Sequence, residues 1–185
     1  PAACALVGAM NPCPCGYLGH PEKNCRCLAV ALDHYRSRIS GPLLDRLEVL
    51  VEVPPLSMDS LEAGRRGEPS EVIRARVVAA RAFCDARLQR DHERNGGPAG
   101  MGRVAWDLER GRPHSLELRG GTLTPDARSL LRHALVKEGL SGRAYTRIID
   151  LARTIADLDN LEEVGVEHVA EALSLRLDYR RLALG

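Results

Sequence analysis

Four cysteines lie within fifteen residues near the start of the sequence, as Cys13-x-Cys15 and Cys25-x-Cys27 with nine residues between the pairs. The stretch around them, AMNPCPCGYLGHPEKNCRC, is rich in glycine, proline and polar side chains. A loop of this composition buries too little apolar surface to hold one shape unaided. The cysteines therefore have to fix it, and how they do so constrains the fold more than any other feature.

Three kinds of site could use these thiols: disulfides, a redox pair or a metal. The N-terminal PAACALVGAM has no basic region before its apolar run and is not a secretory signal. We therefore expect a cytoplasmic, reducing compartment, where structural disulfides are rare. A thioredoxin-like redox site would show Cys-x-x-Cys. Two Cys-x-Cys pairs can instead close a tetrahedral zinc site, although His20 could replace one ligand and incidental free thiols are the plain alternative. We predict structural zinc on Cys13, Cys15, Cys25 and Cys27.

Two segments flanking the loop predict β-strands. Ala3–Met10 is continuously apolar, as in a strand buried on both faces of a parallel sheet. In Leu47–Val53 every second residue from Leu47 is apolar and shares one face, and Glu48 and Glu52 lie on the other. Between them we expect a helix over Ala29–Arg38 and a short one within Ser40–Arg46. Two strands are too few for a stable sheet, so we expect the other strands upstream.

The second half predicts helices throughout. A helical pattern of apolar residues covers Ser70–Arg90, and Thr124–Gly139 combines a capping threonine with a closing glycine. Ser141 is placed to cap a third helix, and Val166–Leu177 supplies the last. The glycine-rich residues 95–102 predict a loop. The predicted fold is an α/β portion followed by an all-α domain, mainly α overall.

Composition excludes few classes of function. Apolar residues make up 44% of the 185 residues and the formal net charge is +1, as in an ordinary globular protein. No apolar run approaches the roughly 18–20 residues that a membrane span needs, so we expect no membrane partner. A charge so near neutral argues against a protein that coats nucleic acid, although basic patches can exist within a neutral total.

Three motifs, in order, carry a resemblance to a known family: AMNPCPCGYLG, HYRSRISGPLLDRLEV and GLSGRAYTRIIDLARTIADL. Together they resemble the C-terminal half of the magnesium-chelatase-like AAA+ ATPases of bacteria, the ComM/YifB family. The likeness covers about residues 5–53 and 124–177, and residues 95–121 depart from it. It implies that residues 1–55 are the C-terminal portion of an AAA+ core, 56–69 a linker and 70–185 a helical lid.

The resemblance also implies roles for four residues. Asn11, after a buried strand, would be sensor 1, which orients the attacking water, whereas the residues alone favour a simple Asn-Pro turn. Arg46 would be the arginine finger, although by itself it is one of many surface arginines. Arg143, at the start of a lid helix, would be sensor 2, with Arg147 as the reserve candidate.

The phosphate-binding motif of such ATPases is absent. Gly-x-x-x-x-Gly-Lys-[Ser/Thr] needs a lysine before a hydroxyl residue, but Lys23 precedes Asn24 and Lys137 precedes Glu138. We therefore expect a C-terminal fragment that is inactive alone and whose partners include the missing N-terminal part of its core. The magnesium-binding strand would also lie upstream.

The resemblance implies that the full-length protein binds ATP and Mg²⁺. Identical subunits would form a ring, expected to be a hexamer, that works on DNA, as in branch migration during recombination or natural transformation. Magnesium chelation is suggested only by the family's name. The alternative is a stand-alone zinc-stapled interaction or nucleic-acid-binding module without catalysis.

Overall fold

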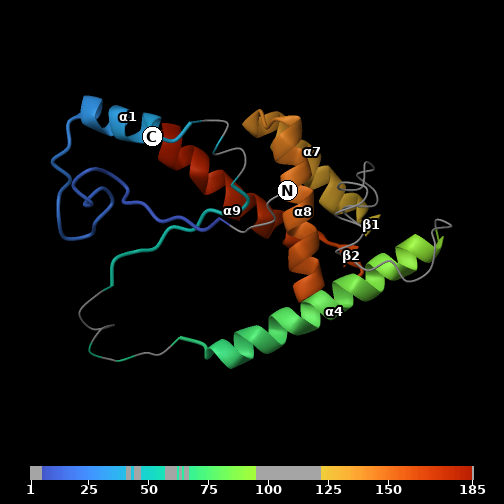
Figure 1. The fold of residues 1–185 in the computed structure, drawn as a ribbon. Coiled ribbons are helices and arrows are strands. Elements are labelled where there is room, and N and C mark those ends of the chain that lie inside the picture. The colour runs from blue at the N-terminus through green and yellow to red at the C-terminus, as the bar shows by residue number, and fades with distance from the viewer. Residues whose placement is uncertain are drawn as a thin grey trace.

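The computed structural model describes residues 6–40, 47–56, 67–94 and 122–184, together with the single residues 43, 62 and 64. These residues hold five helices whose bounds are described and one pair of two-residue strands (Figure 1). In chain order the elements are α1 (Ala29–Ser37), α4 (Ser70–Arg94), β1 (Thr122–Leu123), α7 (Pro125–Glu138), α8 (Gly142–Leu158), β2 (Glu163–Val164) and α9 (Val166–Leu184).

Side-chain caps begin α7 and α8. The Thr124 hydroxyl accepts a hydrogen bond from the Ala127 amide at 3.3 Å, and Ser141 does the same for Ala144 at 3.2 Å. Each cap satisfies one of the amides that the first helical turn leaves without a backbone partner. Gly139 ends α7 with φ 55°, a left-handed conformation that glycine adopts without steric cost. The predicted ends of these helices are confirmed.

The main core lies among α7, α8 and α9. Leu131, Ile148 and Val169, one from each helix, are at most 1% exposed. The prediction of an all-α second half needs one correction, because β1 pairs in parallel with β2, Leu123 opposite Val164. Two residues are too few to show the alternation by which a strand is recognised in a sequence. The pair fastens the start of α7 to the loop after α8.

The two strands predicted in the first part do not form within the described residues. Residues 6–10 and 47–56 have no regular secondary structure, and Val7 and Val53 are 93% and 84% exposed. A strand is stable only beside other strands, and none of the described residues offers one to these segments. The helix predicted at Ala29–Arg38 is confirmed as α1, whereas the one in Ser40–Arg46 lies outside the described residues except for Ser40 and for Leu43, which is helical. The mainly α character is therefore confirmed, but the α/β portion is not.

The long helix α4 contacts α8 and is buried only from its middle onward among the residues whose burial is described. Ala80, Cys84 and Arg87 form its buried stripe, at the spacing of one helix face. The first half, represented by Ile73 at 41% exposure, extends away from the other helices, and Figure 1 shows this half of α4 standing clear of α8. None of the described helices has the length and apolar character needed to cross a membrane.

A buried charged cluster joins α4 to α8. The Arg87 guanidinium contacts both carboxylate oxygens of Asp157, at 3.2 and 3.3 Å, and Arg153 reaches the same carboxylate at 3.0 Å. Arg153 also donates to the carbonyls of Leu161 and Glu162. Burial lowers the pKa of Arg153, while the negative charge of Asp157 opposes that shift. The negative charge of one carboxylate thus offsets the positive charges of two buried guanidinium groups.

We expect the substitution Asp157→Ala to lower the free energy of unfolding by about 3–5 kcal/mol, because it removes the buried carboxylate that two buried guanidinium groups share. Urea denaturation followed by circular dichroism measures this loss. The matched control is Glu162→Gln, which removes the exposed ion pair of Glu162 with Arg90, 2.6 Å long, and should cost less than about 1 kcal/mol. Equal losses in the two variants would contradict the role given to the cluster.

Candidate metal centre and nucleotide-binding residues

Two tight turns shape the cysteine loop. The Gly16 amide donates to the Cys13 carbonyl at 3.0 Å, and the His20 amide donates to Tyr17 at 3.2 Å. Gly16 has φ 81°, which an L side chain rarely adopts. The first turn folds Cys15 back beside Cys13, and the chain then returns with Cys25 to the same place. The glycine- and proline-rich composition noted in the sequence thus allows the turns that bring the cysteines together.

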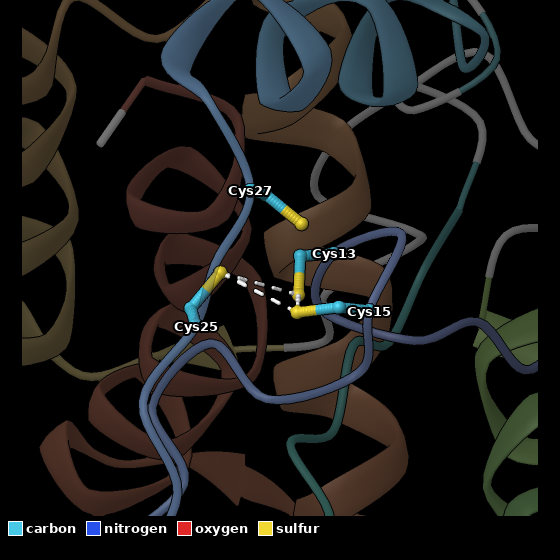
Figure 2. A group of neighbouring side chains, drawn as sticks. All are labelled: Cys13, Cys15, Cys25 and Cys27. Carbon is cyan, nitrogen blue, oxygen red and sulfur yellow. Dashed lines mark hydrogen bonds between the residues drawn. The ribbon is translucent and has the colours of Figure 1, made fainter.

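The four cysteine side chains converge on one point (Figure 2). The Sγ–Sγ distances are 3.3 Å for Cys13–Cys15, 3.6 Å for Cys15–Cys25 and 3.7 Å for Cys13–Cys25. With Cys27, all four sulfur atoms lie within 4.8 Å of one another. Tetrahedral zinc with Zn–S bonds of about 2.3 Å places its sulfur ligands about 3.8 Å apart. The cluster therefore has the ligand type, number and spacing of a structural zinc site.

The surroundings of the thiols also fit a cation. Cys13 is fully buried, and its sulfur accepts a hydrogen bond from the Leu18 amide at 3.4 Å. A hydrogen bond from the backbone of Tyr17 is the main cause that lowers the pKa of Cys15 to about 6. Burial, with the neighbouring thiols, raises the pKa of Cys27 to about 12. Four adjacent thiolates repel one another, so all can ionise only around a positive ion, which deprotonates the thiols it binds.

His20 lies within the cysteine loop but is not part of the cluster. Its Nδ1 accepts hydrogen bonds from the amides of Glu22 and Lys23, both at 3.1 Å. Its ring packs edge-on against Tyr17, with centroids 5.8 Å apart, and the Lys23 ammonium lies 5.0 Å from the Tyr17 ring centroid. Histidine here orders the tip of the loop, so the alternative in which His20 replaces a cysteine ligand has no support in the geometry.

The cysteine loop links Asn11 to α1. Asn11 is two residues before Cys13, and α1 begins two residues after Cys27. From α1, the Tyr35 hydroxyl donates to the Asn11 carbonyl at 3.1 Å. This contact between residues 24 positions apart closes the loop at its base. Asn11 itself is exposed, so its side chain is accessible to a ligand.

The arginines singled out in the sequence have different surroundings. Arg143, in the first turn of α8, is exposed and makes no hydrogen bond or ion pair with the described residues. Arg147, one turn later, forms an ion pair with Glu48. Arg46 lies outside the described residues. The structure thus leaves Arg143 accessible to an anion, whereas Arg147 is occupied.

Two family models match this chain in succession. The first, described as magnesium chelatase, subunit ChlI, matches residues 1–61, and the second, described as the C-terminal part of that subunit, matches residues 67–176. The chain belongs to the magnesium chelatase subunit ChlI family. The family predicted from the three motifs is confirmed.

Curated relatives match the ChlI-family chain over nearly all its length. Competence protein ComM of Haemophilus influenzae is 36% identical over 98% of this chain and 32% of its own length. The uncharacterized protein YifB of Escherichia coli is 34% identical over 95% of this chain and 31% of its own length, and the YifB protein of Salmonella typhimurium is 32% identical. The chain spans about a third of the length of these relatives.

The sequence did not predict how this ChlI-family chain holds residues 47–50. Arg176 on α9 donates to the Leu47 carbonyl at 3.1 Å, and the Leu50 amide donates to the Leu175 carbonyl at 3.0 Å. A backbone acceptor leaves no signal in a sequence. The buried charged cluster that joins α4 to α8 does leave a signal in the sequence, because Arg153 and Asp157 are four residues apart within an otherwise apolar stripe of α8.

Proposed function

We propose that this chain is the C-terminal part of an AAA+ ATPase of the ChlI family, whose full-length form hydrolyses ATP in a ring and uses it to work on DNA. The observation that carries the proposal is the ordered match of both family models, together with relatives about three times as long. One relative's name, competence protein ComM, supports work on DNA during natural transformation.

Three residues would act on the nucleotide. Asn11 would orient the attacking water, Arg143 would contact the phosphates from the lid, and Arg46 would reach the nucleotide of the neighbouring subunit. ATP would supply the phosphoryl group, and Mg²⁺ would neutralise part of the phosphate charge. A guanidinium suits both arginine positions, because it is always charged and its planar donors match phosphate oxygens. The exposure of Asn11 and Arg143 supports these roles.

The exposed apolar segments support a missing partner. Val7, Val51 and Val53 are 93%, 65% and 84% exposed, although they belong to the two stretches whose pattern favours strands. A sheet supplied by the N-terminal part of the core would cover them. In this arrangement residues 1–55 complete the core, 56–69 link it to the lid, and 70–185 form the lid.

Zinc would be structural in this function. Four cysteine ligands fill a tetrahedral shell and leave no position for substrate, so the ion would not take part in hydrolysis. Its effect would be to fix the loop between Asn11 and α1. Cys13 and Cys27 lie at the two ends of that loop, whose base is closed by the contact between Tyr35 and Asn11.

The experiment that tests the function uses the full-length protein and the variant Arg143→Ala. We expect ATP hydrolysis, measured with branched DNA present, to fall between about 10-fold and 100-fold, because a charge-assisted contact to phosphate is worth about 1.5–3 kcal/mol. Arg143 is exposed, so the helix content should not change.

The matched control is Arg132→Ala, an exposed arginine on α7 that should leave hydrolysis as it is. If the unaltered full-length protein hydrolysed no ATP with or without DNA, the ATPase proposal would be wrong and the zinc-stapled binding module would be favoured. If Arg143→Ala unfolded the lid instead, Arg143 would be a structural residue.

A further inference from the structure

The helical domain holds the segment Leu47–Leu50 by three contacts, which we call the clamp. Arg147 of α8 pairs with the Glu48 carboxylate, Arg176 of α9 donates to the Leu47 carbonyl at 3.1 Å, and the Leu50 amide donates to the Leu175 carbonyl at 3.0 Å. Figure 1 shows this segment running beside α9. Residues about 100 or more apart in sequence are thus fastened together.

The three contacts of the clamp are polar. Arg176 is 9% exposed, so its bond to the Leu47 carbonyl is shielded from water and is stronger than an exposed one. Val49 in the segment and Val51 directly after it are 46% and 65% exposed and contribute little burial. Removing the charged contacts should therefore release the segment without disturbing the core of α7, α8 and α9.

The segment begins directly after Arg46 in the sequence. We propose that Arg147 and Arg176 are positioning residues, which fix the backbone that follows the arginine finger and so make its placement depend on the lid. The inference rests on the proposed function, because it takes Arg46 as the finger. It also gives Arg147 a role other than contact with nucleotide. A movement of α8 and α9 would then shift the residue that serves the neighbouring subunit.

The test compares three full-length variants: Arg147→Glu, Glu48→Arg and the two together. We expect each single reversal to lower kcat for ATP hydrolysis about fivefold, the scale of one partly exposed ion pair, with KM for ATP within about twofold. The double variant restores the pair in the opposite sense, so kcat should return to within about twofold of the original. Arg132→Glu is the matched control for an added negative charge and should change neither value.

A second measurement does not depend on ATP. Amide hydrogen exchange at Leu50 should speed up about fivefold or more in each single reversal and in Arg176→Met, and should slow again in the charge-swapped double variant. Unchanged exchange and kcat in the single reversals would overturn the clamp, whatever Arg46 does. Faster exchange with unchanged kcat, in a protein whose activity needs Arg46, would overturn the positioning role.

Two further results separate this inference from the proposed function. If KM for ATP rose and the double variant gave no rescue, Arg147 would contact nucleotide and the inference would be wrong. If Arg46→Ala left hydrolysis normal, the finger would be wrong, and the positioning role would fail with it even if the exchange data showed the clamp.

Discussion

The substitution Arg46→Ala in the full-length protein is expected to lower ATP hydrolysis by about 10³–10⁵-fold, while nucleotide binding persists. An arginine finger neutralises charge that develops only in the transition state, so its removal affects the rate far more than affinity. Steady-state hydrolysis and equilibrium binding of a fluorescent nucleotide measure the two effects separately. Arg46→Lys should not restore the rate fully, since an ammonium lacks the planar pair of donors.

Mixed rings show whether Arg46 serves a neighbour. A finger that acts across a head-to-tail interface cannot serve its own subunit. Mixing Arg46→Ala subunits with subunits that lack the phosphate-binding lysine of the core should therefore restore part of the activity, because some interfaces then contain neither defect. Two results would contradict this role: mixed rings that form but recover no activity, or normal hydrolysis by Arg46→Ala. Arg46 would then be an ordinary surface arginine.

The second large effect concerns the four-cysteine cluster. We expect about one zinc ion per chain, and we expect Cys25→Ala to lose both the zinc and the ordered loop. Binding of structural zinc contributes on the order of 10 kcal/mol in small zinc domains, and the loop has little apolar surface to hold it otherwise. Elemental analysis gives the stoichiometry, and amide exchange over residues 11–28 reports the order of the loop.

Cys84→Ala is the control for the zinc experiment. Cys84 is a buried thiol on α4 outside the cluster, so this variant should keep its zinc and its loop. Protein that is free of metal yet protected from exchange across the loop would show that hydrogen bonds alone fix it. Zinc retained by Cys25→Ala would mean that another group completes the ligand shell.

The sequence predicted local structure well. Thr124, Ser141 and Gly139 fix helix ends by contacts within a few residues, and the capping chemistry of such residues can be read directly. The cysteine cluster was predictable for the same reason, since ligand spacing and turn residues lie in one short stretch. The family came from three longer motifs. Contacts between distant segments were not predictable.

The predicted strands show where sequence reasoning fails. Leu47–Val53 has the alternation of a strand, but a strand also needs a neighbouring strand, and the contacts described for this segment come from the helices α8 and α9. The β1–β2 pair was missed for the opposite reason: two residues carry no pattern, and their pairing depends on how α7 and α8 are packed. In both cases tertiary context decided the outcome.

The attachment of α4 at one end has a mechanical consequence. Its buried stripe begins at Ala80, so Ser70 lies ten residues beyond the contact with α8. At about 1.5 Å per residue this overhang is about 15 Å long, and a rotation of about 10° about the buried end displaces its tip by roughly 2.5 Å. A helix held in this way is a lever arm, because a small rotation about its buried part becomes a larger displacement of its free end.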